Sequence, residues 1–197
     1  MLSLDSLPTL VFAVVMLSWF AFVIVFFARK SPPSPPDSKR DRISIWGIAL
    51  QGVGYGIVWA VHRPFFTPIA KVGKQLEIVV AVLTMIVAIG SVWFVLNAIR
   101  TLGKQWSLAA RLLEGHKLVT EGPYRIVRNP IYTGMFGMLL ATGLAISHWI
   151  GLLIGIIAFA VGTVIRVHSE EKLLREAFGA EFEAYAHRVP AVIPFLF

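Results

Sequence analysis

Long apolar stretches that contain no charged residue alternate along this chain with short polar segments. Three of them, Leu7–Ala28, Ile43–Val61 and Ile78–Ile99, have 22, 19 and 22 residues. An α-helix needs about 20 residues to cross the ~30 Å hydrocarbon core of a bilayer. Each of the three stretches therefore predicts one membrane-spanning helix.

A fourth charge-free stretch, Ile131–Ile165, has 35 residues, which is too many for a single span. Its polar break is Ser147-His148-Trp149, and tryptophan is typical of the membrane interface. The stretch therefore predicts a hairpin of two short spans over residues 131–165. The expected fold class is an all-α integral membrane protein with five transmembrane helices.

The segment after the fifth span has a pattern of its own. Residues 166–185 place apolar side chains on one helical face and Glu and Lys on the other, as an amphipathic helix does. We therefore expect a C-terminal amphipathic helix over residues 166–185, and an apolar tail over residues 189–197 that packs on the protein or on the membrane surface. The apolar stripe consists of Leu173, Leu174, Ala177, Phe178, Phe182 and Tyr185.

Glycines recur in two of the predicted spans. Gly52, Gly54 and Gly56 lie in the second span, and Gly151 and Gly155 lie in the fifth. A nucleotide-binding loop would need a preceding strand, which the pattern does not predict. The glycines favour close packing between helices instead.

Composition supports the membrane assignment. Of the 197 residues, 57% are apolar and 15% are charged, whereas soluble domains average roughly 45–50% and about 25%. The chain has no cysteine, which excludes disulfides, thiolate metal sites and cysteine nucleophiles.

The distribution of basic residues predicts the orientation in the membrane. Fifteen of the 18 Lys and Arg residues lie in segments 29–42, 100–130 and 166–197, and three lie in segment 62–77. With five spans, the three richest segments fall on one side, which the positive-inside rule makes cytoplasmic. We therefore expect the N-terminus outside and the C-terminus in the cytoplasm. The net charge of +7 then reflects membrane topology, and no nucleic-acid partner is predicted.

Polar residues gather in two clusters at the cytoplasmic ends of the last two spans. The cluster before the fourth span consists of Tyr124, Arg125, Arg128, Asn129 and Tyr132. The cluster after the fifth span consists of Arg166, His168, Glu170 and Glu171. Because the two spans form a hairpin, the two clusters are expected to meet beside the bilayer.

A structural interpretation of these clusters stays open. Basic residues such as Arg125 also anchor topology, and acids such as Glu170 and Glu171 suit the positive end of a helix dipole. His116 and His168 do not have the spacing of metal ligands, so no metal site is predicted.

The C-terminal half carries a family resemblance. The run GPYRIVRNPIYTG, the apolar hairpin, and then EEKLLREAFGAEFEAYAHRVPAVIPF resemble the isoprenylcysteine carboxyl methyltransferase family. That family belongs to a wider group of membrane methyltransferases, which includes phospholipid N-methyltransferases. The resemblance covers about residues 100–197, so we divide the chain into three spans over residues 1–99 and a catalytic half over residues 100–197.

The resemblance implies S-adenosylmethionine as cofactor, in a cytoplasmic site roofed by the loop 100–130 and closed by the C-terminal helix. Arg166 would face the methyl acceptor, and Glu171 or His168 would take a proton if that acceptor is an amine. Asn129 stands where the family usually has histidine, so a role that needs a titrating group there is in doubt. The implied cofactor contacts are His116, Lys117, Leu118, Val119, Tyr124, Arg128, Asn129, Tyr132 and Glu170.

The expected reaction is methyl transfer to a lipophilic acceptor that enters from the bilayer, first of all the carboxylate of a prenylated cysteine. The alternatives are phospholipid N-methylation, a nicotinamide-dependent reaction like that of sterol reductases, and a non-catalytic scaffold or small transporter. Membrane lipids are further expected partners. The expected location is the plasma (inner) membrane if the source is prokaryotic, and the endoplasmic reticulum if it is eukaryotic.

Overall fold

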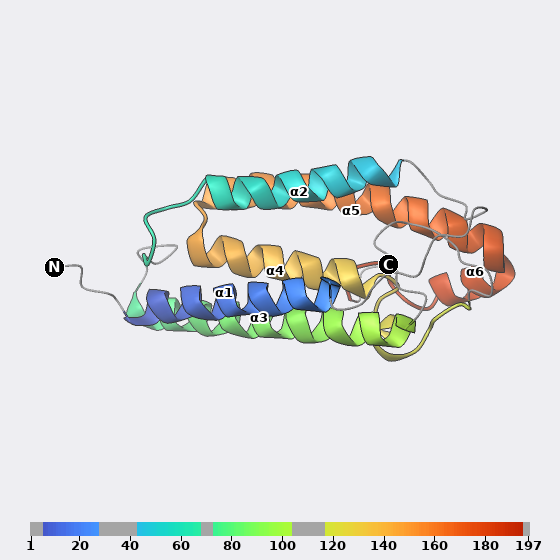
Figure 1. Ribbon diagram of the computed structural model, residues 1–197, viewed down its shortest axis with the longest axis horizontal. Helices are drawn as coiled ribbons and strands as arrows, with labels where there is room; N and C mark the ends of the chain where they lie inside the picture. Colours follow the sequence, from blue (N-terminus) through green and yellow to red (C-terminus); the bar gives the residue numbers. More distant parts are fainter. Residues whose placement is uncertain (1–5, 28–42, 68–72, 104–116, 195–197) are drawn as a thin grey trace.

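The computed structural model describes residues 6–27, 43–67, 73–103 and 117–194, and most of these residues are helical. Within these ranges, five long helices run side by side along the longest axis, and two short helical segments lie near one end of the bundle (Figure 1). The elements are α1 (Ser6–Phe27), α2 (Ser44–Ala60), α3 (Lys74–Leu102), the 3-10 helix η2 (Gly122–Arg125), α4 (Pro130–Ile146), α5 (Trp149–Phe178) and α6 (Ala180–Ala186).

Helix α4 occupies the centre of the bundle. It lies between the α2–α5 pair on one side and the α1–α3 pair on the other (Figure 1). Its side chains Met138, Leu139 and Ala141 are fully buried. The hairpin predicted over residues 131–165 is therefore present, and it turns at Ser147 and His148 as the sequence predicted.

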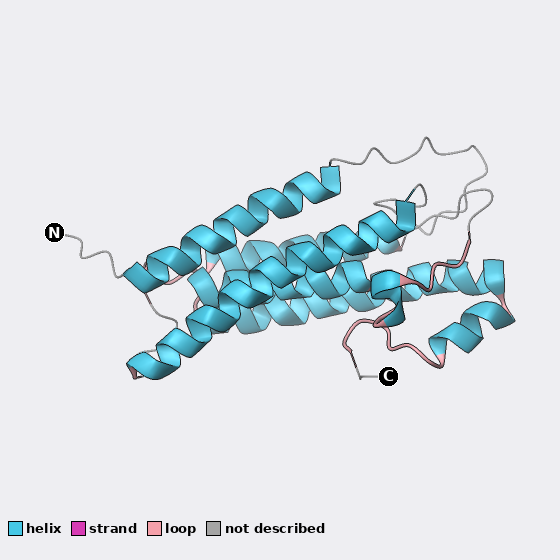
Figure 2. Cartoon of the chain, turned by 90° about the horizontal axis from the view of Figure 1, so that it is seen from below, coloured by secondary structure: helices cyan, strands magenta, loops and turns pink. Residues whose placement is uncertain are grey.

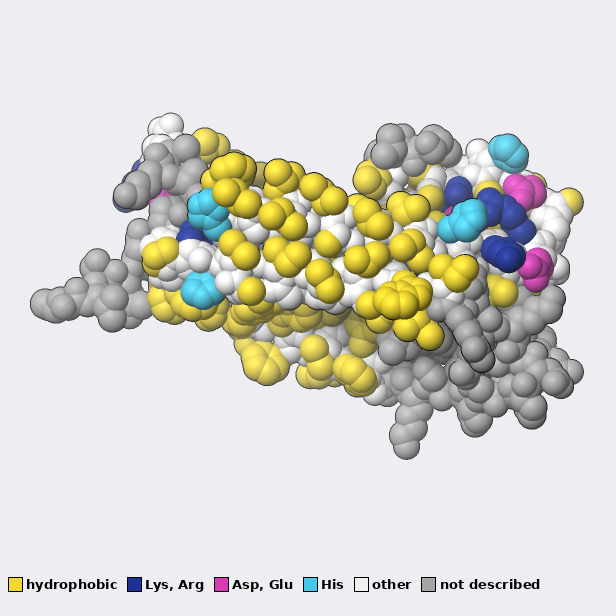
Figure 3. All heavy atoms as spheres, turned by 90° about the horizontal axis from the view of Figure 1, so that it is seen from above, with side chains coloured by type: hydrophobic (Ala, Val, Ile, Leu, Met, Phe, Trp, Pro, Cys, Tyr) yellow, Lys and Arg dark blue, Asp and Glu magenta, His cyan; other side chains and the backbone are white. Residues whose placement is uncertain are grey.

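The outer surface of the bundle is apolar, as a lipid-facing surface must be. Large side chains such as Phe20, Trp46 and Val164 are 69%, 71% and 68% exposed. Figure 3 shows such side chains covering the long middle of the molecule, while charged and histidine side chains gather near its ends. Apolar side chains cover the outside of the bundle, and small or apolar side chains make the contacts inside it. This arrangement indicates an integral membrane protein.

Among the described residues, three helices are long and apolar enough to cross a bilayer by length and composition: α1 over Leu7–Phe27, α3 and α5. Helices α2 and α4 have 17 residues each, which at 1.5 Å per residue gives roughly 25 Å. That is shorter than the ~30 Å hydrocarbon core. The helical fold is therefore confirmed over the described residues, and the count of five spans stays a prediction.

The amphipathic segment predicted over residues 166–185 is helical, but it is not one helix. Its first part continues α5, which runs without interruption from Trp149 to Phe178, and the chain turns at Gly179, whose φ of 49° lies in the left-handed region. Since nothing between residues 165 and 178 breaks a helix, the end of the predicted fifth span at Ile165 is not the end of a helix. At 30 residues, α5 is about 45 Å long, so it extends well beyond one hydrocarbon thickness.

Glycines bring α2 and α5 into close contact. A Cβ added to Gly54 would lie 2.8 Å from the carbonyl oxygen of Gly155, and one added to Gly151 would lie 2.7 Å from the Cβ of Val61. The predicted packing role is confirmed for these glycines. It is wrong for Gly52 and Gly56, which face open space.

The end of the bundle away from α6 is fastened by Arg63. Its Nη2 donates to the carbonyl oxygens of Leu144 and Ala145 at 2.8 and 2.7 Å. Its Nη1 donates to the carbonyl oxygen of Ser147 at 2.7 Å. These carbonyls lie at the C-terminus of α4, where they have no partner within the helix. Arg63, one of the three basic residues in segment 62–77, is therefore a helix cap and not a free surface charge.

Candidate active site

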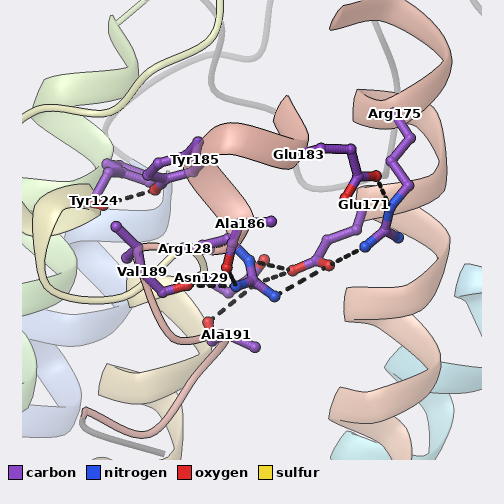
Figure 4. A network of polar contacts seen from close by, with 10 residues as sticks. All are labelled: Tyr124, Arg128, Asn129, Glu171, Arg175, Glu183, Tyr185, Ala186, Val189 and Ala191. Atoms are coloured by element: carbon purple, nitrogen blue, oxygen red, sulfur yellow. Dashed lines mark hydrogen bonds and ion pairs between the residues drawn. The ribbon is translucent and has the colours of Figure 1, made fainter. Parts of the chain in front are cut away.

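The two polar clusters that the sequence predicted do meet, at the end of the bundle that carries α6. Arg128 and Asn129 precede α4, and Tyr132 lies in its first turn. Arg166, Glu170 and Glu171 lie on α5. Each of these six side chains contacts at least one other across the α4–α5 junction (Figure 4 draws the half around Glu171).

Arg128 and Glu171 form the first half of the site. Nε of Arg128 donates to Oε1 of Glu171 at 2.9 Å, and Nη2 donates to Oε2 at 3.3 Å. Glu171 is 6% exposed, so this two-point contact is largely shielded from water. Nη1 of Arg128 donates to the backbone carbonyls of Ala186, at 2.8 Å, and Val189. The guanidinium therefore joins α5 to the chain that follows α6.

Asn129 fastens the same C-terminal segment. Its backbone N–H and its Nδ2 donate to the carbonyl oxygen of Ala191 at 2.9 and 3.1 Å. Nδ2 also lies 3.3 Å from Oε1 of Glu171. The backbone N–H of Arg128 donates to Pro190 at 2.8 Å, so residues 186–191 run against the start of α4. The described part of the apolar tail thus packs on the protein, as one of the two predicted alternatives.

Arg166, Tyr132 and Glu170 form the second half. Nε of Arg166 donates to the hydroxyl of Tyr132, and that hydroxyl donates to Oε1 of Glu170, both at 2.5 Å. Nη2 of Arg166 also donates to Oε1 of Glu170 at 2.9 Å. The guanidinium carbon lies 5.2 Å from the centre of the Tyr132 ring. Arg166 is 7% exposed, so a permanent cation is held inside the bundle by an anion and a phenol.

Tyr124 and Tyr185 close the site from the side of η2 and α6. The hydroxyl of Tyr185 donates to the backbone carbonyl of Tyr124 at 2.6 Å, and both side chains are buried. Burial raises the pKa of both phenols above the usual range, and the nearby carboxylate of Glu170 adds to this for Tyr124. For Tyr185, Arg128 opposes the rise and Glu171 supports it. Both tyrosines are therefore neutral at physiological pH.

The other predicted site residues are less closely tied to this cluster. His116 lies outside the described residues. Lys117 is exposed, while Leu118 and Val119 are half-buried in the extended stretch before η2. His168, offered as an alternative base, is exposed. Within the described ranges, no three His, Cys, Asp or Glu side chains gather as a metal site would require.

Two parts of the site were not found from the sequence. The first is the set of backbone carbonyls at Ala186, Val189 and Ala191, which carry no signal in residue type. The second is Arg175, which lies 3.4 Å from Glu171 and 2.8 Å from Glu183. Its spacing of four residues from Glu171 on a helix was a readable signal for that pair.

The arrangement decides what Glu171 can do chemically. Its two oxygens accept from Arg128, Asn129 and Arg175. These contacts occupy the lone pairs that a base would use. Glu171 is therefore suited to organise the site. Glu170 is more open, since its side chain is 27% exposed.

The fold and the site define a helical membrane protein with a buried cluster of arginine, carboxylate and tyrosine side chains, at the point where α4 begins beside α5. The profile of the family described as phospholipid methyltransferase matches residues 78–181. The chain belongs to this family. The match begins within α3, earlier than the resemblance at about residue 100 indicated.

Individual relatives agree with that family. The chain is 37% identical over 106 residues to protein-S-isoprenylcysteine O-methyltransferase B of Arabidopsis thaliana, which covers 51% of this chain and 52% of the relative. It is 32% identical over 89 residues to protein-S-isoprenylcysteine O-methyltransferase of Schizosaccharomyces pombe, covering 45% and 38%. The chain thus spans about half or less of the length of these relatives. The resemblance to isoprenylcysteine methyltransferases is confirmed.

A longer match connects the chain to a protein with a different kind of name. It is 30% identical over 167 residues to the nickel-cobalt-cadmium resistance protein NccN of Alcaligenes xylosoxydans xylosoxydans, covering 82% of this chain and 70% of the relative. This alignment covers a larger share of the chain than the two above.

Proposed function

We propose that the protein is an S-adenosylmethionine-dependent methyltransferase that acts at the cytoplasmic face of a membrane on a lipophilic acceptor. The observation that carries the proposal is the buried Arg166–Tyr132–Glu170 cluster, which lies where the apolar bundle ends. Burying ionisable side chains beside the membrane costs free energy, and residues of this kind usually mark a functional site. The family match and the relatives named isoprenylcysteine methyltransferases support the reaction class.

The described residues fit this cofactor at one end. The cofactor supplies a methyl group on a sulfonium, and it also carries an ammonium and a carboxylate. Among the described residues, both contacts of Glu170 to its neighbours use Oε1, which leaves Oε2 for an ammonium group. The aromatic rings of Tyr124 and Tyr132 suit a sulfonium or an adenine.

The carboxylate end of the cofactor is less simply matched. Arg128 has the right fork geometry for a carboxylate, but its guanidinium is bound to Glu171 and to two carbonyls. A direct contact to the cofactor requires these bonds to rearrange. The assignments of Arg128, Asn129, His116, Lys117, Leu118 and Val119 to the cofactor stay predictions.

The site suits an acceptor that is already an anion, such as the carboxylate of a prenylated cysteine. Methyl transfer is a direct displacement, so the protein contributes mainly by positioning the reactants and excluding water. A carboxylate needs no base, whereas an amine acceptor must lose a proton. Glu171 is occupied by three donors and His168 points to the exterior. This supports a carboxylate over the headgroup amine of a phospholipid.

Titration of the purified protein with S-adenosylhomocysteine and with NADPH tests the cofactor. By isothermal titration calorimetry, we expect S-adenosylhomocysteine to bind and NADPH to give no binding heat. Binding of NADPH alone would place the protein with the nicotinamide-dependent alternative, and binding of neither would favour a scaffold or transporter. Transfer of labelled methyl groups to a prenylated cysteine, compared with phosphatidylethanolamine, then tests the acceptor. Labelling of the amine alone would reverse the acceptor assignment.

A further inference from the structure

Helix α2 borders the proposed site, although its sequence offers no polar motif. Gly47 faces α5 at the level of Arg166. A Cβ added to Gly47 would lie 2.5 Å from Cγ of Arg166, 2.7 Å from the carbonyl oxygen of Gly162 and 3.3 Å from the backbone nitrogen of Arg166. Real Cβ atoms do not approach other heavy atoms closer than about 3 Å. The aliphatic stem of Arg166 therefore occupies the space that any side chain at position 47 would need.

This contact acts on the stem of Arg166 and not on its charged end. Beyond the stem, the guanidinium reaches Tyr132 and Glu170 at 2.5 and 2.9 Å. A free arginine side chain has many rotamers, and a stem packed against bare backbone loses most of them. The bare backbone of Gly47 and the two polar partners together select one orientation of the guanidinium.

The other glycines of α2 do not share this position. A Cβ added to Gly52 or Gly56 would meet nothing within 4 Å. Gly54 is as tightly packed as Gly47, but its neighbours are Gly155 and Phe159, which lie about three and two turns of α5 away from Arg166. Gly47 is thus the α2 glycine whose missing side chain makes room for a residue of the site.

Two serines one turn beyond this contact add a second observation. Ser169 follows Arg166 by three residues on the buried face of α5, and Ser44 precedes Gly47 by three residues on the buried face of α2. Because the two helices are antiparallel, both serines lie on the same side of the Gly47–Arg166 contact. Both hydroxyls are buried and lack a hydrogen-bond partner among the described residues. An unsatisfied buried hydroxyl destabilises the fold relative to alanine, and proteins accept such costs mainly at functional sites.

We propose that Gly47 is a positioning residue of the methyl-transfer site, which seats Arg166 so that its guanidinium meets the anionic head of the acceptor. The proposal rests on the proposed function, because that function assigns Arg166 to the acceptor. Gly47 does not itself touch a reactant. Replacing it with alanine displaces the stem of Arg166 and misplaces the guanidinium.

A double-mutant cycle tests the contact between Gly47 and Arg166. Gly47→Ala and Gly54→Ala are each made in the wild-type protein and in Arg166→Ala, and thermal stability and acceptor turnover are measured. Gly54→Ala is the matched control, because it causes the same kind of clash between α2 and α5 away from the site. Gly52→Ala controls for helix propensity alone. Interacting residues give non-additive effects in such a cycle, and separate ones give additive effects.

In the wild-type protein, we expect Gly47→Ala to lower kcat/KM for the acceptor by about 10- to 100-fold, as a misplacement of about 1 Å does. Gly54→Ala should lower it far less, at a similar loss of Tm. The Tm loss caused by Gly47→Ala should shrink in Arg166→Ala, where the clashing Cγ is gone. Equal Tm losses in both backgrounds, or equal turnover losses for Gly47→Ala and Gly54→Ala, would overturn the proposal. The Tm measurements need no enzymatic activity, so they test the contact between Gly47 and Arg166 even if the proposed reaction is wrong.

Discussion

The side chains of Arg128 and Glu171, which are 43 positions apart in the sequence, contact each other through two hydrogen bonds of 2.9 and 3.3 Å. This pair joins the start of α4 to the extension of α5 beyond the apolar bundle (Figure 4). Figure 2 shows the loop that follows α6 running back from the tip of the molecule toward the helix bundle. The pair, together with Asn129, therefore organises the end at which we place the reaction.

Arg128→Ala should release the C-terminal segment. The variant loses charged hydrogen bonds to Glu171 and to the carbonyls of Ala186 and Val189. Each such bond contributes about 1.5–3 kcal/mol. We expect a lower Tm, faster amide hydrogen exchange over residues 186–191, and weaker binding of S-adenosylhomocysteine. Arg175→Ala is the control, because that side chain is 41% exposed and should contribute less than about 1 kcal/mol. Unchanged exchange in Arg128→Ala would show that the segment is held by other contacts.

Glu170→Gln and Arg166→Ala should give different kinetic outcomes, although the two side chains are paired at 2.9 Å. Glu170→Gln removes the anion assigned to the cofactor ammonium, so affinity for S-adenosylhomocysteine should fall by roughly 10- to 150-fold, the equivalent of ~1.5–3 kcal/mol. Arg166→Ala should keep cofactor affinity and lose turnover of the acceptor. Arg166→Lys should recover part of the rate through its charge. Calorimetry and single-turnover assays distinguish these outcomes, and equal behaviour of both variants would contradict the assignment.

Arg63→Ala should destabilise the fold without changing the site. Its guanidinium caps the C-terminus of α4 through three carbonyl contacts of 2.7–2.8 Å. Loss of these charged hydrogen bonds should cost about 2 kcal/mol or more, which appears as a lower Tm in detergent. Cofactor affinity should stay normal, because the cap lies at the opposite end of α4. Arg125→Ala, at an exposed position, serves as control. A large change in affinity in Arg63→Ala would mean that the two ends are coupled.

Alkaline pH should destabilise the protein through Tyr124 and Tyr185. Burial raises the pKa of both phenols in the folded protein above their value of about 10 in the unfolded chain. The folded state therefore binds protons more strongly, so its advantage is complete below pH ~10 and is lost as pH rises through the folded pKa values. Thermal unfolding at a series of pH values above 10 should show a falling Tm. Tyr185→Phe should weaken this dependence, and an equally steep fall in that variant would exclude Tyr185 as its source.

The predicted orientation can be tested with introduced cysteines, because the chain has none of its own. Thr67 lies at the end that carries Arg63, and Glu181 lies in α6 at the other end. In intact cells, an impermeant thiol reagent should label Thr67→Cys and should not label Glu181→Cys. Labelling of Glu181→Cys before lysis would reverse the topology.

The sequence by itself determined the first four long helices to within a few residues. The charge-free stretches at residues 7–28, 43–61 and 78–99 became α1, α2 and α3, because hydrocarbon tolerates only apolar side chains on a self-satisfied backbone. The same pattern located the turn between α4 and α5 at Ser147. Since helices that share a short turn are antiparallel neighbours, it also predicted that Arg128 and Glu171 would come together.

Only the tertiary structure decided how the site is built. The chain past Phe178 folds back so that the carbonyls of Ala186 and Ala191 reach Arg128 and Asn129, and a backbone carbonyl is the same in every residue type. Nothing in the sequence distinguishes Gly47 from Gly52, yet Gly47 lies against Arg166 and Gly52 faces open space. Which face of α2 packs on α5 depends on the summed packing of both helices, and no local pattern around either glycine carries that information.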